Sequence, residues 1–425
     1  MKMVYIVPGT GQAFYCENCF RDYSLVSGLR AAGHEVTVVP LYLPVNQEGG
    51  ASEGIGPLFF GAVRLYLEEK IPPLKRLPET FLRSLNAPPL LAFAASRAGS
   101  TRASGNEKLT LTMLDGENGN QAPEFERLAD WIVKEVRPDA VIISNILLLG
   151  IASSIRVRSN ISILCFAQDE DTWVNASATG YRDAIWAAIA RHEESINRFL
   201  SLSKWYVNRV APFVKIAPER FAVVPFGVNP DQYVASGHDN DLPVIGFLSR
   251  LNRANGFQML VEAYRCLSKR ENNGSVAGLS FCGGSTADDR IEIARCLKSA
   301  EGFGPLTVEK KFEHPDRARF LSSLAVLSVP GPEPIAFGTF IVEALAAGVP
   351  VVQPDFGGFS EIGEMTDSVI GYRPFTAESL ADALASLCRD RARRKKLGKQ
   401  GRDLVRSHFN YTNMAGRVIG VIETS

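Results

Sequence analysis

The sequence predicts an α/β protein built from two doubly wound domains, each with a parallel sheet between layers of helices. Short apolar runs rich in β-branched residues alternate with amphipathic helical stretches, which is the pattern of strand–helix–strand units. The alternation restarts after Asn208, and the 425 residues suffice for two or three domains with cores of their own.

The first half contains the candidate strands and helices of one such domain. We expect strands at 3–7, 35–40, 140–144, 162–167, 199–202 and 222–224. Helices are expected at 18–32, 123–136 and 182–198. Residues 46–119 interrupt the alternation with several prolines, so we expect an insert of helices and loops there.

The second half repeats the pattern. Strands are expected at 244–248, 278–282, 306–310, 325–329 and 349–351, and helices at 255–269, 315–323, 338–347, 377–388 and 391–408. A turn-rich, polar stretch before this half marks a linker. The first predicted domain is therefore 1–225, with the insert at about 46–119, and the second is 243–408. A linker over 226–242 joins them. A C-terminal helix over 409–425 is expected to pack back on the first domain.

Charge and hydropathy narrow the class of protein. Lys plus Arg number 46 and Asp plus Glu number 46, so nucleic acid is not an expected partner. The densest basic run, Arg391–Lys399, is interpreted as a solvated helix face. The longest apolar run, Ala140–Ile155, is too short and too polar to cross a bilayer. We expect a cytoplasmic protein with no transmembrane segment, and a peripheral contact at the inner membrane face stays open.

Seven cysteines, an odd number, indicate reduced thiols rather than a disulfide framework. Cys16 and Cys19 have neither a second cysteine pair nor a nearby His, so the sequence predicts no zinc site and no redox role for them. We expect their side chains to line the cleft for the acceptor or to pack beneath it.

Two loops could hold an anionic ligand. The first strand ends in Gly9-Thr10-Gly11-Gln12, where glycines let backbone N–H groups approach an anion. The third glycine of the dinucleotide fingerprint is missing, which disfavours an NAD-dependent dehydrogenase, and a plain strand-to-helix turn stays open. In the second half, Gly338 precedes a helix that carries Glu343 among apolar residues. Such a carboxylate needs hydrogen-bond donors, which ribose hydroxyls or a nearby Lys or Arg could supply.

The chain resembles the retaining family-four glycosyltransferases. The residues that carry the resemblance are Phe337-Gly338, Glu343-Ala344, Gly348-Val349-Pro350-Val351-Val352, Ser249-Arg250-Leu251, Ala32-Gly33-His34-Glu35-Val36 and Val223-Val224-Pro225-Phe226-Gly227-Val228. The spacing within the second-half segment is specific, and the likeness covers nearly the whole chain outside 46–119. It implies the GT-B fold, in which two Rossmann-like domains face each other across a cleft.

The resemblance implies a nucleotide-sugar donor of the UDP or GDP type, without a cofactor and without a bound metal. In this family a helix dipole and cationic side chains take the place of a divalent ion. Glu343 would hold the ribose and Arg250 the diphosphate. The other donor-binding residues it implies are Gly9, Gly11, Phe337, Gly338 and Thr339.

Three positions depart from the family pattern. Asn255 stands where a Lys is usual, so Arg253 would have to supply that charge. The family has two glutamates in this region, and the second matches Glu343. In an alignment without a gap the first falls on Ile335, whereas it falls on Glu333 if the loop is two residues longer; we favour Glu333. Gln168 replaces the usual His, and Gln can bond a sugar hydroxyl but takes no proton at neutral pH.

The acceptor or donor-sugar side is predicted to involve residues that follow strands of the first domain. These are Gln12, Asn18, Gln168, Asp169 and Glu170. A solvated acidic loop at 169–171 is the open alternative. The acceptor itself, whether glycan, lipid-linked or small-molecule, is not indicated by the sequence.

The predicted function is transfer of a sugar, with retention, from a nucleotide sugar to an acceptor hydroxyl in glycan or glycoconjugate biosynthesis. Arg250, Glu333 and Glu343 would carry the catalysis of this hexosyltransferase-like enzyme. The departures leave open a non-catalytic scaffold of the same fold that binds a sugar nucleotide or a partner protein. An epimerase or phosphorylase would need a carboxylate pair or a cofactor lysine, and the sequence shows neither in a convincing context.

Overall fold

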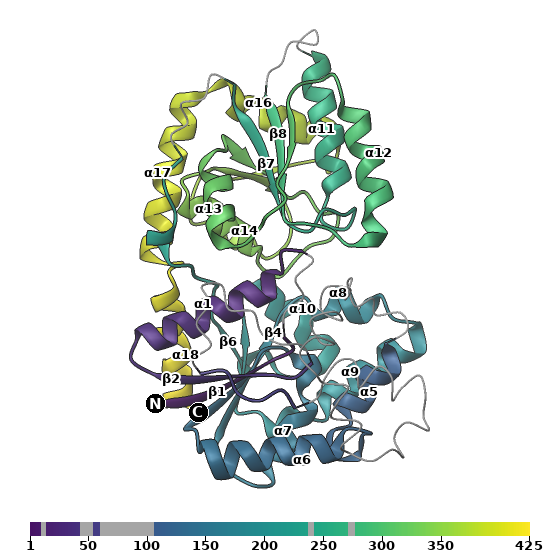
Figure 1. Ribbon diagram of the computed structural model, residues 1–425, viewed down its shortest axis with the longest axis vertical. Coiled ribbons are helices and arrows are strands. Elements are labelled where there is room, and N and C mark those ends of the chain that lie inside the picture. Colours follow the sequence, from purple (N-terminus) through teal and green to yellow (C-terminus); the bar gives the residue numbers. More distant parts are fainter. Residues whose placement is uncertain (10–13, 43–53, 60–105, 237–241, 271–276) are drawn as a thin grey trace. The chain divides into compact units, whose positions relative to one another are not determined.

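The computed structural model describes residues 1–9, 14–42, 54–59, 106–236, 242–270 and 277–425. It contains two six-stranded parallel sheets with helices packed against them (Figure 1). The chain divides into two compact units. The first consists of residues 1–12, 25–225 and 415–425, and the second of residues 13–24 and 226–414. Most of the predicted insert lies outside the described residues.

The sheet of the first unit has the order β2-β1-β3-β4-β5-β6. Its strands are β1 (Lys2–Val7), β2 (Glu35–Pro40), β3 (Ala140–Ile143), β4 (Ser162–Ala167), β5 (Arg198–Ser201) and β6 (Phe221–Val223). β1 pairs with β2 on one side and with β3 on the other, so strand order reverses at β1. The helices assigned to this unit are α5 (Glu107–Leu114), α6 (Ala122–Asp130), α7 (Gly150–Arg156), α8 (Glu170–Asn175), α9 (Thr179–Ala190) and α10 (Lys204–Val214).

The sheet of the second unit has the order β12-β11-β10-β7-β8-β9. Its strands are β7 (Val244–Leu248), β8 (Gly278–Cys282), β9 (Leu306–Val308), β10 (Val326–Leu327), β11 (Val351–Pro354) and β12 (Val369–Tyr372). Its helices are α11 (Phe257–Arg270), α12 (Arg290–Ala300), α13 (His314–Ser322), α14 (Thr339–Ala346), α15 (Ser360–Gly363), α16 (Ala377–Arg389) and α17 (Arg391–Ser407). Strand order reverses between β7 and β10, which pair directly.

Two further helices are shared between the units. α1 (Glu17–Ala31) begins with residues of the second unit and ends with residues of the first, and α18 (Tyr411–Glu423) does the same near the C-terminus. Residues 13–24, which the sequence analysis placed in the first domain, therefore cluster with the second unit. The physical reason is a set of hydrogen bonds that these residues make with the second unit, described below.

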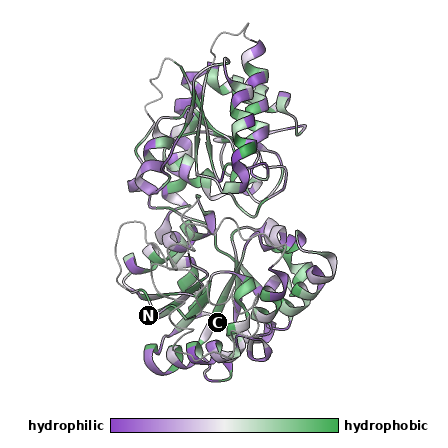
Figure 2. Cartoon of the chain, turned by 45° about the vertical axis from the view of Figure 1, so that its right-hand side comes forward, coloured by the Kyte–Doolittle hydropathy of each residue, from purple (hydrophilic) through white to green (hydrophobic). Residues whose placement is uncertain are grey.

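The core of each unit is its sheet together with the helix faces that cover it. Hydrophobic residues concentrate in the strands, and hydrophilic ones on the outer faces of the helices (Figure 2). Val4, Ile142 and Phe166 in the first sheet, and Phe247 and Phe281 in the second, are fully buried. Strands buried on both faces read as continuous apolar runs, which is why the sequence located most of them.

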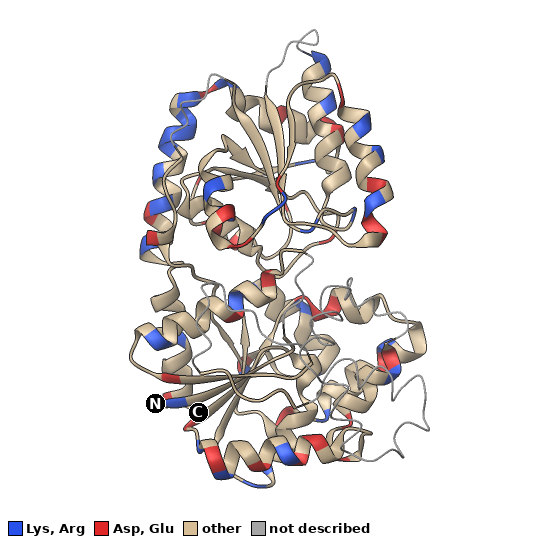
Figure 3. Cartoon of the chain, in the orientation of Figure 1, with Lys and Arg blue, Asp and Glu red and all other residues tan. Residues whose placement is uncertain are grey.

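The structure corrects the sequence reading at the second sheet. β12 was not predicted, because Val369–Tyr372 is only half-buried and its apolar run is short. β10 is a two-residue strand, shorter than the expected 325–329. Lys and Arg residues run along α17 (Figure 3), and most of them are exposed, as expected of a solvated face. Arg394 is the exception, since it is buried and donates to the carbonyl oxygens of Leu387 and Cys388.

Within the residues that the structure describes, no helix has both the length and the apolarity that crossing a bilayer requires. In the same part of the chain, no group of three or more His, Cys, Asp or Glu is arranged to hold a metal ion.

Candidate functional site

The strand order of the second sheet marks one edge as the place for a ligand. In open parallel sheets, ligands bind at the carboxyl ends of the strands where the order reverses, here β7 and β10. The loop after β7 carries Arg250 and Asn255, and the loop after β10 leads to Gly338 and α14. The two loops pack closely at Gly256, where a Cβ atom would lie 2.0 Å from the carbonyl oxygen of Pro330. The topology thus brings the predicted donor-binding segments to one edge.

Glu343 is fully buried inside α14 and its carboxylate has three partners. Its Oε1 accepts from the Tyr233 hydroxyl at 2.8 Å and from Arg317 Nε at 3.1 Å. Its Oε2 accepts from the Tyr15 hydroxyl at 2.6 Å. Burial, followed by the charge of Glu343, raises the pKa of Tyr15 well above its ordinary value, so its hydroxyl stays a donor.

Arg317 completes this buried cluster. Its side chain is 1% exposed and forms an ion pair with Glu343. The guanidinium also lies over the rings of Tyr15 and Phe20, at 4.9 and 4.5 Å from the ring centroids. Removing either charge of such a pair would leave the other buried and uncompensated. Of the two partners that the sequence analysis left open for Glu343, an internal arginine is present.

The N-terminus of α14 holds a carboxylate. Gly338, the N-cap residue, has a φ of 83°, which favours glycine. The backbone N–H of Thr339 donates to Oε2 of Glu17 at 3.0 Å, and the Thr339 hydroxyl donates to the same oxygen at 2.7 Å. The unpaired N–H groups and the dipole of a helix start favour an anion at this position. Phe337 is buried and packs edge-on against Phe409.

Arg250 is held in a defined orientation at the same edge. Its Nε and Nη2 atoms contact Oδ2 of Asp289 at 3.0 and 2.9 Å, and Nη2 also donates to the Thr286 hydroxyl. Burial opposes ionisation of Asp289, but hydrogen bonds from Thr286 and Arg250 outweigh it and hold the pKa of Asp289 below its ordinary value. The Arg250 guanidinium lies 5.0 Å from the centroid of the Phe14 ring.

The three departures from the family pattern have different outcomes. Asn255 supports the loop, because its Nδ2 donates to the Ser249 hydroxyl at 2.9 Å and to the Arg250 carbonyl at 3.0 Å. Arg253 and Glu333 are both exposed, and Ile335 is half-buried. The structure therefore brings Arg250, Thr339 and Glu343 against one short segment, residues 14–17, whereas Glu333 and Arg253 are exposed.

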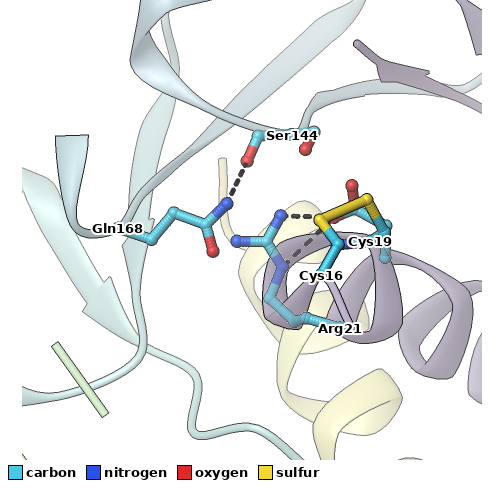
Figure 4. The surroundings of a disulfide bond; sticks show 6 residues. Cys16, Cys19, Arg21, Ser144 and Gln168 are labelled. Atoms are coloured by element: carbon cyan, nitrogen blue, oxygen red, sulfur yellow. Dashed lines mark hydrogen bonds and ion pairs between the residues drawn. A yellow bond between two sulfur atoms is a disulfide. The ribbon is translucent and has the colours of Figure 1, made fainter. Parts of the chain in front are cut away.

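Three of the predicted residues, Gln168, Asp169 and Glu170, directly follow the carboxyl end of β4. Gln168 is 2% exposed and donates from Nε2 to the Ser144 carbonyl at 3.3 Å (Figure 4). Its Oε1 accepts no hydrogen bond from the described residues. Asp169 adopts a left-handed backbone conformation, with a φ of 49°. Gly9 is half-buried and Asn18 exposed, while Gly11 and Gln12 lie outside the described residues.

Glu170 is a buried structural carboxyl rather than part of a solvated loop. It accepts hydrogen bonds from the backbone N–H of Gln168, from that of Ile146 and from the Tyr206 hydroxyl. Burial raises its pKa to about 8. The neighbouring Asp171 is 1% exposed and pairs with Arg209. The acidic run therefore fixes the loop after β4 and leaves Gln168 as the side chain with an unused acceptor.

Four residues that contact the predicted donor-binding groups were not identified from the sequence: Tyr15, Glu17, Tyr233 and Arg317. Tyr15 and Glu17 belong to the segment Phe14–Cys19, which directly follows the glycine-containing loop after the first strand, and that position was the available signal. Tyr233 and Arg317 lie 110 and 26 positions from Glu343, and no local pattern identifies them.

The cysteine prediction is wrong for one pair. Cys16 and Cys19 form a disulfide at the start of α1 (Figure 4). A spacing of three residues at a helix start brings the two sulfurs together, so the first turn itself makes the bond geometrically accessible. The other cysteines keep their thiols.

Residues 229–404 match the sequence family described as glycosyl transferases group 1. A lipopolysaccharide 1,2-N-acetylglucosaminetransferase of Salmonella typhimurium is 24% identical over 224 residues, which cover 51% of this chain and 58% of that protein. The match thus spans little more than half the length of this curated relative.

Solved structures extend the likeness to the whole chain. Sucrose-phosphate synthase from Thermosynechococcus elongatus aligns with a TM-score of 0.72 at 20% identity, covering 100% of this chain and 98% of that one. Anabaena HepE, solved in complex with UDP-glucose, aligns with a TM-score of 0.66 at 13% identity, with both chains fully covered. The chain therefore has the GT-B fold, and residues 229–404, within its second unit, are similar to the glycosyl transferases of group 1.

Proposed function

We propose that this chain, which has the GT-B fold and is similar over residues 229–404 to the glycosyl transferases of group 1, transfers a sugar from a UDP- or GDP-activated donor to an acceptor hydroxyl. The observation that supports the proposal is that Arg250, the N-terminus of α14 and Glu343 each contact one short segment, residues 14–17, and follow the strands at which the order of the second sheet reverses. These groups supply a cation, a set of backbone donors and an acceptor for hydroxyl groups, which is what a diphosphate followed by a ribose requires.

When the donor binds, its hydroxyl and phosphate groups would take the places of protein groups of the same chemical kind. A ribose hydroxyl bonded to Glu343 would take the role that the Tyr15 hydroxyl has in this structure. A phosphate at α14 would take the role of the Glu17 carboxylate. Arg250 and the helix dipole would stabilise charge on the leaving diphosphate without a metal. Asn255 cannot add a positive charge, so the exposed Arg253 would have to approach for that purpose.

The acceptor side is proposed for the loop after β4 in the first unit. Gln168 keeps a buried amide oxygen without a protein donor, and a buried acceptor left unpaired costs about 1–3 kcal/mol. A sugar hydroxyl would satisfy it. We also propose, from the family resemblance, that anomeric configuration is retained, with the departing diphosphate accepting the proton of the incoming hydroxyl.

The biological setting is proposed by likeness. The Salmonella relative is named for lipopolysaccharide synthesis, which supports a role in glycan or glycoconjugate biosynthesis. We place the protein in the cytoplasm, where a peripheral contact with the inner membrane face would suit a lipid-linked acceptor.

The decisive experiment is a donor screen under reducing conditions. UDP- and GDP-sugars are offered to the purified chain, and free nucleotide and new glycoside are followed by mass spectrometry, while binding is followed by calorimetry. Turnover in the wild type that is lost in Arg250→Ala supports the proposal. Binding without hydrolysis or transfer would favour the second candidate, a non-catalytic scaffold, which is motivated by Asn255 and by the exposure of Glu333. Absence of any nucleotide binding would reject both.

A further inference from the structure

One short segment contacts Arg250, Thr339 at the start of α14 and Glu343, the three groups on which the proposed function rests. The ring of Phe14 lies over Arg250, at 5.0 Å from the centroid to the guanidinium carbon. The Tyr15 hydroxyl bonds Glu343 at 2.6 Å. The Glu17 carboxylate bonds the N–H of Thr339 at 3.0 Å. Cys16 and Cys19 follow in the same segment and are joined by a disulfide.

The backbone of the segment is anchored as well. The N–H of Tyr15 donates to the carbonyl oxygen of Gly283 at 2.7 Å, and Phe14 forms an antiparallel bridge with Gly284. Gly283 and Gly284 directly follow β8, next to β7 in the sheet. All these contacts lie within the second unit, to which residues 13–24 belong. The segment is therefore part of the same edge that the donor would use.

The contacts of the segment match those of the ligand in chemical kind. Glu17 presents an anion to a helix N-terminus, where a phosphate would sit. Tyr15 presents a hydroxyl to the Glu343 carboxylate, where a ribose would sit. The same lone pairs and N–H groups cannot serve the segment and a nucleotide sugar at once, so binding of one requires departure of the other.

From the proposed function we infer that residues Phe14–Cys19 form a redox-controlled plug of the donor site. The Cys16–Cys19 disulfide keeps the segment in place, and its reduction by a dithiol releases the segment and opens the site to a nucleotide sugar.

The chemistry is a thiol–disulfide exchange. A thiolate of the external dithiol attacks one sulfur of the Cys16–Cys19 bond, forms a mixed disulfide with that cysteine and releases the other cysteine as a thiolate. The second thiolate of the reductant then attacks the reductant's own sulfur in the mixed disulfide and releases the remaining cysteine. The chain gains two electrons and two protons as two thiols form, and the dithiol leaves as its disulfide. Both cysteines are half-buried rather than enclosed, so a reductant can reach them.

The disulfide favours the plugged state because it limits the freedom of the released segment. Closing a loop lowers the conformational entropy of the unconstrained chain. For a loop this short, the disulfide raises the ratio of plugged to released segment by about tenfold. Glu17 lies inside that loop, so its position at α14 depends on the ring. In the cytoplasm, disulfides of ordinary proteins are usually transient or redox-sensing, which agrees with a switch.

The free thiols outside the segment Phe14–Cys19 provide controls for the effect of a reductant. Burial raises the pKa of Cys282 and of Cys388 to about 12, so both react slowly. Cys266 is a half-buried free thiol in α11, outside the segment Phe14–Cys19. Cys266→Ser is therefore the control for loss of a thiol that has no part in the plug.

The test compares oxidised and dithiol-reduced full-length chain, with the disulfide state verified by mass after alkylation. Affinity for UDP, GDP and UDP-glucose is measured by calorimetry, and hydrogen exchange is measured at peptides containing Thr339. We expect reduction to raise nucleotide affinity about tenfold and to speed exchange at Thr339. The double variant Cys16→Ser/Cys19→Ser should behave as reduced under both conditions, and Cys266→Ser should respond as the wild type does.

A second variant removes the plug contact and leaves the disulfide intact. Glu17→Ala should raise nucleotide affinity in the oxidised chain and speed exchange at Thr339. Equal affinity in the verified oxidised and reduced forms, or weaker binding in Glu17→Ala, would overturn the plug and leave the proposed function standing. Exchange that responds to reduction in a chain that binds no nucleotide would instead reject the proposed function and leave only a redox-dependent segment.

Discussion

The hydroxyl of Tyr15 donates a 2.6 Å hydrogen bond to Oε2 of Glu343, a residue 328 positions later in the chain. The bond joins the start of the sequence to the helix that carries the family-like motif. Together with Arg317 and Tyr233, Tyr15 donates a hydrogen bond to a carboxylate that is fully buried. The protein donors that stabilise the fold and the bound ligand therefore compete for the same carboxylate oxygens. Variants of Glu343 and Arg317 distinguish the two roles.

Replacing Glu343 alone should destabilise the fold, because Arg317 would remain buried without a counter-charge. We expect Glu343→Ala to lower the free energy of unfolding by about 3–5 kcal/mol. The double variant Glu343→Leu/Arg317→Met exchanges the pair for apolar groups and should recover most of that loss. It should nevertheless bind no nucleotide sugar. Chemical denaturation and calorimetry on the same samples check both statements, and normal nucleotide affinity in the double variant would contradict the role of Glu343.

Arg250 should act on the diphosphate and not on the nucleoside. Arg250→Ala is expected to weaken UDP binding at least about tenfold, since a charge-assisted hydrogen bond contributes about 1.5–3 kcal/mol. Uridine, which lacks the phosphates, should bind the variant and the wild type equally. Asp289→Asn is the matched control, because it loosens the arginine but keeps its charge, and its loss should be smaller. Equal loss for UDP and uridine would mean that Arg250 only supports the fold.

Asn255 should contribute to stability through its loop and not through charge. Asn255→Ala removes two hydrogen bonds, to Ser249 and to the Arg250 carbonyl, and should cost about 1–3 kcal/mol in the free energy of unfolding. Asn255→Lys should suffer the same loss, so a lysine at this position would not restore the family pattern by itself. Thermal denaturation of both variants tests this, and an unchanged melting temperature in Asn255→Ala would refute it.

The first unit should lose stability as pH rises from about 5 towards 8. Burial raises the pKa of Glu170 from 4.5 to about 8, so in this window the folded chain holds a proton that the unfolded chain has released. The free energy of unfolding then falls with rising pH and levels off above the folded pKa. Glu170→Gln should flatten this part of the pH profile.

The groups around Glu170 provide a control for that profile. Asp169 adds repulsion that raises the pKa further, whereas Asp171 is already paired with Arg209. Asp169→Asn should therefore shift the decline to lower pH without abolishing it. Denaturation curves between pH 5 and 9 decide the matter, and identical profiles for the wild type and Glu170→Gln would exclude Glu170 as the source.

Local patterns were enough to predict the architecture. Strands β2, β4, β7 and β8 begin and end where the apolar runs predicted, because buried parallel strands need apolar residues on both faces. The α14 segment was recognisable because its glycine, its carboxylate and its following strand lie within a few turns of one another. β10 and β12 were misjudged, since short or half-buried strands have too few apolar residues to stand out.

The sequence by itself determined two doubly wound domains, and it placed Arg250 after a strand, Gly338 at a helix start and Glu343 within that helix, since each of these positions depends on neighbours along the chain. Only the tertiary structure decided what Glu343 contacts, that Glu17 caps α14, and that Cys16 and Cys19 are bonded. Partners of a buried charge are chosen by proximity in space and by the cost of leaving the charge unpaired. Tyr15, Tyr233 and Arg317 are distant in the chain, so no local pattern could have specified them.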